Sequence, residues 1–145
     1  MFGDLLNRLL APAPETLPDA DARLALSALM VRLARADGYY DAEEHARITR
    51  ILSQRYDLDE AGAEALCAEA EVLEAEAPDT VRFTRAIKEA VPHESRAEII
   101  EALWQVALAD DARDAHEDSL IRLVSSLLGL TDQESARARQ KVARG

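Results

Sequence analysis

The chain has 145 residues, 48% of them hydrophobic, and a formal net charge of −11. This length can bury one hydrophobic core without disulfides, and the apolar content excludes a disordered chain. The acidic balance disfavours nucleic acids and anionic lipids as partners, and the sequence has neither a signal-peptide pattern nor an apolar run of about 20 residues for membrane insertion. We therefore expect a cytoplasmic protein.

The N-terminal 20 residues differ in pattern from the rest of the chain. Apolar residues at spacings of three and four predict a short amphipathic helix over residues 2–10. Prolines at positions 12, 14 and 18 predict an extended linker after it. We interpret residues 1–20 as an arm that docks on the body of the protein or on a second copy, which makes a homodimer a candidate assembly. A membrane-surface helix is disfavoured because Asp4 and Arg8 leave the segment neutral.

Residues 21–145 are predicted to form one helical domain. Apolar positions recur with helical spacing, alanine and leucine dominate the apolar set, and no segment alternates with period two over a useful length. The expected helices cover about 21–36, 41–56, 59–77, 79–91, 99–107, 120–128 and 131 onward. The predicted fold is therefore an all-α, compact single-domain bundle of about seven helices, plus the short N-terminal helix.

Three local features complete this prediction. Cys67 is the only cysteine and lies on the apolar side of its helix, which predicts a buried structural thiol and excludes an intramolecular disulfide. Residues 57–79 contain nine acidic side chains and no basic one, which predicts a solvated helix face. The basic C-terminal cluster complements the dipole of the last helix and comprises Arg137, Arg139, Lys141 and Arg144.

One short motif occurs twice. Residues 36–44 and 109–117 both have the pattern A-D-x-x-x-D-A-x-E, 73 positions apart, and each copy lies between two predicted helices. The duplication predicts two helix–turn–helix repeats, about 22–58 and 95–131, related by a pseudo-twofold axis. The third and fourth predicted helices would then connect the repeats.

Helix capping explains part of this motif. Asp41 and Asp114 are suitable N-cap residues, and Glu44 and Glu117 stand three positions later, as in a capping box. Capping leaves the first aspartate of each copy unexplained. Asp37 and Asp110 follow a helix C-terminus, where the helix dipole disfavours negative charge.

A divalent cation is the other interpretation of the motif. Asp111 adds a further acid to the second copy, and crowded carboxylates bind protons more tightly unless a cation neutralises them. Oxygen ligands favour Ca²⁺, Mg²⁺ or Mn²⁺ over Zn²⁺, and the spacing matches neither an EF-hand nor a zinc motif. His45 and His116 lie beside the motif glutamates and are candidates to hydrogen-bond to the metal ligands and orient them. From spacing alone, capping and cation binding both remain open.

At these residues the chain resembles the TerB (tellurite resistance protein B-like) family. The resemblance rests on Ala36-Asp37-Gly38 through Glu43-Glu44, and on Ala109-Asp110-Asp111 through Glu117, and covers roughly residues 22–135. It implies an all-helical fold with pseudo-twofold character, a link to tellurite and other stress responses, and a metal site. The implied ligands are Asp37, Glu44, Asp110 and Glu117, with Asp41, Asp111 and Asp114 as second choices. The sequence departs from the family pattern where Asp111 takes the place of a glycine equivalent to Gly38.

We therefore expect a non-enzymatic cytoplasmic module that binds a divalent cation through paired acidic turns and presents a surface to a protein partner. The alternative is a metal-free helical interaction module, whose acidic segment 57–79 meets a basic protein. Catalysis is disfavoured because no nucleophile-elbow, P-loop or Rossmann glycine pattern occurs. The one cluster suited to acid–base chemistry is Asp110, Asp114, His116 and Glu117.

Overall fold

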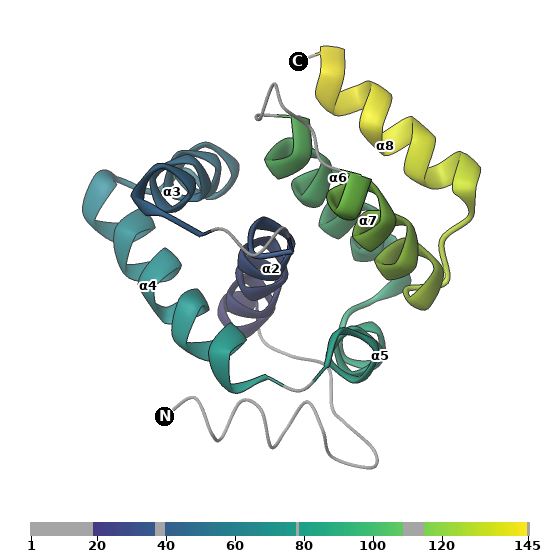
Figure 1. The fold of residues 1–145 in the computed structure, drawn as a ribbon, viewed down its shortest axis with the longest axis horizontal. Helices are drawn as coiled ribbons and strands as arrows, with labels where there is room; N and C mark the ends of the chain where they lie inside the picture. Colours follow the sequence, from purple (N-terminus) through teal and green to yellow (C-terminus); the bar gives the residue numbers. More distant parts are fainter. Residues whose placement is uncertain (1–18, 37–39, 78, 109–114, 145) are drawn as a thin grey trace.

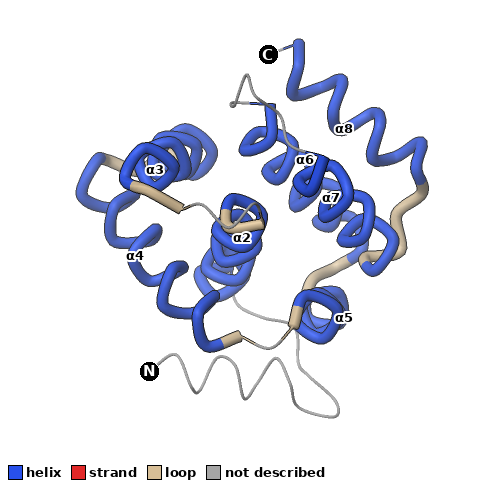
Figure 2. The backbone as a smooth tube through the Cα atoms, in the orientation of Figure 1, coloured by secondary structure: helices blue, strands red, loops and turns tan. Residues whose placement is uncertain are grey.

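The computed structural model describes residues 19–36, 40–77, 79–108 and 115–144, without the side chains of residues 19–21, 82, 90, 93–95 and 115–118. Over these ranges the chain forms seven α-helices and no strand (Figures 1 and 2). The helices are α2 (Asp19–Ala34), α3 (Ala42–Tyr56), α4 (Glu60–Glu76), α5 (Thr80–Ala90), α6 (His93–Leu108), α7 (Ala115–Leu127) and α8 (Asp132–Arg144). The all-α prediction is confirmed. The predicted helix at 2–10 and its linker lie outside the described residues.

Helix α2 is the central element of the core. It lies in the middle of the molecule (Figure 1) and contacts α3, α4, α6 and α7. Every residue from 24 to 31 is buried, so the helix is covered on all sides, whereas the sequence predicted a single apolar stripe. The small residues Ala25, Ser27 and Ala28 allow this close approach. The Ser27 hydroxyl donates a hydrogen bond to the carbonyl of Arg23 at 2.7 Å, which satisfies the buried oxygen.

The other helices pack in two groups around this core. Helix α4 lies against α2 and α3, and helix α8 lies against α6 and α7, while α5 packs on α7. Between α6 and α8, the Trp104 indole donates a hydrogen bond to the Ser135 hydroxyl at 3.2 Å. These contacts bring each predicted helix–turn–helix pair against the helix that follows it. The pseudo-twofold relation between the pairs stays a prediction.

Several helix ends are stabilised as the sequence predicted. Asp59 caps α4 by accepting a hydrogen bond from the Gly62 amide at 2.7 Å. Thr131 and Glu134 form a reciprocal capping box at the start of α8, with hydrogen bonds of 3.1 and 3.0 Å. Gly129 follows α7 with φ +79°, the left-handed conformation that a glycine adopts without a Cβ clash.

The acidic segment 57–79 is only partly the solvated face that the sequence predicted. Most of its described carboxylates are exposed, but Glu74 is buried and Glu71 is half-buried. The prediction is wrong for these two residues because each carboxylate contacts basic side chains from another part of the chain.

Among the described residues, none of the helices combines the length and apolarity that a membrane crossing requires.

Candidate functional site

The first acidic turn connects α2 to α3, and its last aspartate caps the second helix. The Asp41 carboxylate accepts a hydrogen bond from the Glu44 amide at 3.0 Å, and the Asp41 backbone is extended, with φ −112° and ψ −175°. This is the geometry of an N-cap residue. The capping interpretation of Asp41 is therefore confirmed. Asp37 and Gly38, earlier in the same turn, lie outside the described residues.

Glu44 lies in the first turn of α3. Its side chain is 16% exposed, and one of its carboxylate oxygens is 3.9 Å from the Arg47 guanidinium. The neighbouring Glu43 is 80% exposed and also lies 3.9 Å from Arg47. Glu44 is thus the more enclosed of the two glutamates.

A shallow hollow is bordered by residues from the end of α2 and from the second turn of α7. Its volume is about 450 Å³. Ala36, immediately before the first turn, lines it together with Ser119 and Leu120, which lie in the second turn of the helix that follows the second acidic turn. Helices α2 and α7 are in contact, which agrees with this convergence. The residue before the first acidic turn and the second turn of α7 therefore border the same hollow.

A partly buried ion-pair network fixes the α2 side of this hollow. The Glu74 side chain of α4 accepts hydrogen bonds from Arg32 Nε at 3.1 Å and from Arg35 Nη1 at 2.9 Å. Arg32 also donates to the backbone carbonyls of Glu74 and Ala77. Because both arginines lie in the last part of α2 or directly after it, the network attaches the end of α2 to α4 just before the first acidic turn begins.

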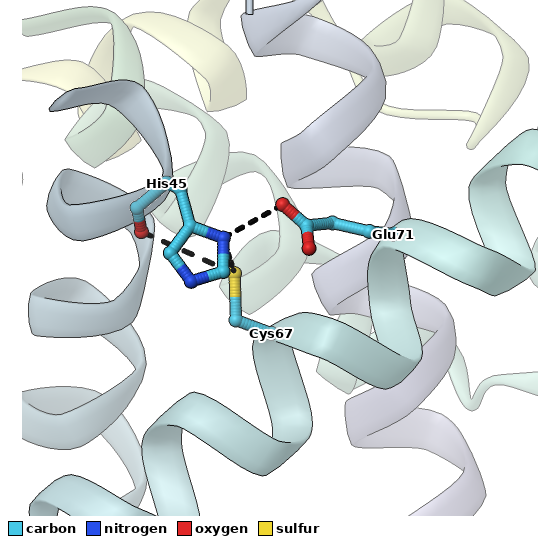
Figure 3. A group of neighbouring side chains, drawn as sticks. All are labelled: His45, Cys67 and Glu71. Carbon is cyan, nitrogen blue, oxygen red and sulfur yellow. Dashed lines mark hydrogen bonds and ion pairs between the residues drawn. The ribbon is translucent and has the colours of Figure 1, made fainter. Parts of the chain in front are cut away.

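A second cluster of polar side chains lies between α3 and α4. His45 Nδ1 is 2.7 Å from Glu71 Oε2 and 3.5 Å from Cys67 Sγ, and these three side chains point toward one another (Figure 3). The second ring nitrogen, Nε2, is 2.6 Å from Glu64 Oε1. The Tyr40 hydroxyl donates a hydrogen bond to the same Glu71 oxygen that His45 contacts. The imidazole is thus held between two carboxylates and a thiol.

A comparison with family models matches residues 23–140 to the family described as tellurite resistance protein TerB. The chain belongs to the TerB family. The match covers most of the chain and includes both acidic turns. The searches of curated proteins and of solved structures gave no match.

Most of the acidic residues expected at a TerB metal site fall outside the described part of the chain. This applies to Asp37, Asp110, Asp111 and Asp114, while Glu117 and its neighbour His116 lie in α7 without described side chains. Glu44 and Asp41 are the two expected ligands whose side chains are described, and they lie at the start of α3. The ligand set of the two turns therefore stays a prediction.

His45, expected to support the motif glutamates, has its described partners on α4 instead. The hydrogen bond to Glu71 is the main cause that raises the pKa of His45. Burial lowers this pKa, and the hydrogen bond to Glu64 raises it. Burial, followed by the bond to Glu71, raises the pKa of Tyr40, and burial raises the pKa of the Cys67 thiol. In the metal-free TerB domain these shifts favour a charged imidazolium beside a neutral phenol and a neutral thiol.

The sequence pattern did not predict that Cys67, Glu64 and Glu71 lie beside His45. The sequence does contain a signal on α4, because these residues lie at spacings of three and four and so share one face of the helix. The pairing with His45 depends on how α3 packs against α4, which no spacing within one helix reveals. Cys67 is fully buried, as predicted, but its neighbours include a histidine and a glutamate in addition to the apolar core.

Proposed function

We propose that this TerB-family chain is a non-enzymatic module that binds a divalent cation through its two acidic turns. The ligands would be Asp37 and Glu44 from the first turn, and Asp110 and Glu117 from the second. Carboxylate oxygens suit Ca²⁺, Mg²⁺ or Mn²⁺. Binding would attach the two helical hairpins to each other and stabilise one surface for a protein partner. The family description adds a role in tellurite resistance to the proposal, and a cation site would extend that role to metal stress.

The observation that carries this proposal is that the end of α2 and the second turn of α7 border one hollow. Ala36 precedes Asp37 directly, and it lines this hollow together with Ser119 and Leu120. A shared cation needs carboxylates from two segments within one coordination sphere, about 5 Å across. The end of α2 and the second turn of α7 at one hollow support such an arrangement, whereas positions on opposite sides of the domain would oppose it.

The hollow itself is not the proposed site. The guanidinium groups of Arg32 and Arg35 line it, and a cation is repelled by them. Glu74 neutralises part of that charge. The proposed ligands belong to the turns themselves, in which Asp37 and Asp110 carry negative charge after a predicted helix C-terminus, where the helix dipole disfavours it.

Thermal unfolding of the full chain tests this function. Chelator-treated protein is compared with protein in millimolar Ca²⁺, Mg²⁺ or Mn²⁺. A cation at 100 times its dissociation constant stabilises the folded state by about 2.7 kcal/mol, which raises the melting temperature of a domain this size by about 10 °C. The double variant Asp37→Asn with Asp110→Asn should lose this rise.

The matched control removes the same number of charges elsewhere. Glu60 and Glu69 are exposed on α4 and belong to neither turn, so the double variant Glu60→Gln with Glu69→Gln should keep the full rise. An identical melting temperature with and without every cation would contradict the proposal and favour a metal-free interaction module. Equal losses in both double variants would also contradict it, because the effect would then come from net charge alone.

A further inference from the structure

We propose that His45, Cys67 and Glu71 form a binding site for a zinc-like transition-metal ion, with His45 Nδ1, Cys67 Sγ and a Glu71 oxygen as ligands. This site is separate from the acidic turns and goes beyond the proposed function, because it uses other ligands and suits another class of metal. The three ligand atoms lie within 4.8 Å of one another in the described structure (Figure 3).

Two packed helices fix this arrangement. Cys67 and Glu71 are four residues apart on α4, so their side chains project from the same face, one turn after the other. His45 lies in the first turn of α3, which packs against α4. A fixed backbone on both sides of a site reduces the entropy lost when an ion orders its ligands.

The distance between the nitrogen and the sulfur agrees with that of a tetrahedral metal site. With Zn–N of about 2.0 Å and Zn–S of about 2.3 Å, a nitrogen and a sulfur ligand lie about 3.5 Å apart. The observed separation between His45 Nδ1 and Cys67 Sγ is 3.5 Å. The nitrogen and oxygen ligands of such a site lie about 3.3 Å apart, and His45 Nδ1 to Glu71 Oε2 is 2.7 Å. To bind the same ion, the Glu71 carboxylate would move away from the ring, and its side chain is 23% exposed.

The donor set selects the metal. A thiolate and an imidazole are poor ligands for Ca²⁺ or Mg²⁺ but good ligands for Zn²⁺ and Co²⁺, and a carboxylate completes a common zinc combination. Three protein ligands leave a fourth position for water. On binding, the thiol and the Nδ1 side of the ring release their protons to solvent, and the ion takes their place.

Glu64 lies where a carboxylate commonly orients a metal-binding histidine. Such a histidine commonly donates its other ring N–H to a carboxylate, which fixes the tautomer and increases the basicity of the ligand nitrogen. With Nδ1 on the ion, His45 Nε2 would donate to Glu64 Oε1, now 2.6 Å away. Glu64 is 56% exposed and His45 is 24% exposed, so solvent reaches this side of the cluster and an ion can approach from it.

Cobalt absorption spectroscopy on the full chain tests the site. Because Cys67 is the only cysteine, a thiolate-to-cobalt charge-transfer band can arise within one chain from this residue alone. Chelator-treated protein, kept reduced with a thiol-free phosphine, is titrated with Co²⁺ and then with Zn²⁺. We expect a band that saturates at one equivalent of Co²⁺ and disappears when one equivalent of Zn²⁺ replaces it.

Four variants define the ligands. Cys67→Ala removes the band, and its circular dichroism spectrum and melting curve establish that it is folded. Glu71→Gln weakens Co²⁺ binding, Glu64→Gln weakens it about 10- to 100-fold, and Glu69→Gln, on the exposed side of the same helix, leaves it unchanged. The double variant Asp37→Asn with Asp110→Asn also keeps the band, which separates this site from the acidic turns.

Absence of the charge-transfer band in the native chain at excess Co²⁺ and neutral pH would overturn the proposal, and the cluster would then be a metal-free hydrogen-bond network. A band that persists in Cys67→Ala would overturn it as well. Unchanged Co²⁺ affinity in Glu71→Gln would remove Glu71 from the ligand set and contradict the site as stated.

Discussion

Glu74 is the buried carboxylate that attaches the end of α2 to α4, and replacing it with the isosteric glutamine isolates the effect of its charge. The side chain accepts one hydrogen bond from Arg32, which is 15% exposed, and one from Arg35, which is 37% exposed. A hydrogen bond to a charged group contributes about 1.5–3 kcal/mol when enclosed, and an ion pair as exposed as that of Arg35 contributes less than about 1 kcal/mol. Glutamine retains one neutral acceptor, so the expected net loss is about 2 kcal/mol.

The measurement is urea unfolding of Glu74→Gln beside native protein, supported by thermal melting, where the loss corresponds to a fall of about 8 °C. The control is Glu76→Gln, which removes the same charge from an exposed position on the same helix and should change stability by less than about 0.5 kcal/mol. If the two variants lost the same small amount, the Glu74 network would not be what attaches α2 to α4, and the reasoning would be refuted.

Three further predictions concern single positions. Thr131→Ala removes half of the capping box with Glu134 and should cost about 1 kcal/mol in urea unfolding; a loss below about 0.3 kcal/mol would contradict the cap. Gly129→Ala should cost about 1–2 kcal/mol through its positive φ alone, because the added Cβ meets neighbours at ordinary contact distances of 3.7 Å or more; unchanged stability would contradict the left-handed conformation. The raised pKa of His45 means that metal-free protein gains stability below the unfolded value of about 6.5 and loses it as pH rises through the folded value. The stability difference between native protein and His45→Gln in chelator should therefore be larger at pH 6 than at pH 9, and a difference independent of pH would contradict the pairing with Glu71.

The helices were predictable because local signals agreed with the global fold. Asp59 and Thr131 mark helix starts, Gly129 marks an end, and each does so through a hydrogen bond or a backbone conformation that involves only nearby residues. The burial of α2 on all sides was not predictable, since it depends on how many neighbours surround the helix. Periodicity reveals the apolar positions of a helix but not the number of helices that cover them.

In the candidate site, too, local contacts were predictable from the sequence and contacts between helices were not. Asp41 was predicted as a cap from its position before a helix, and the structure confirms it. Glu74 and Glu71 were expected in solvent with the other acids of their segment, and both instead have partners on other helices. Long-range pairs such as Arg35 with Glu74 and His45 with Glu71 arise from helix packing, which a single sequence read segment by segment does not encode in any spacing.

The most direct measurement is a crystal structure of the full chain grown with Ca²⁺. The proposed function predicts one Ca²⁺ ion with carboxylate oxygens of both Asp37 and Asp110 at about 2.3–2.6 Å, the usual Ca²⁺–oxygen distance. A structure in which the two aspartates lie too far apart to share an ion, or in which Ca²⁺ binds neither turn, would contradict it.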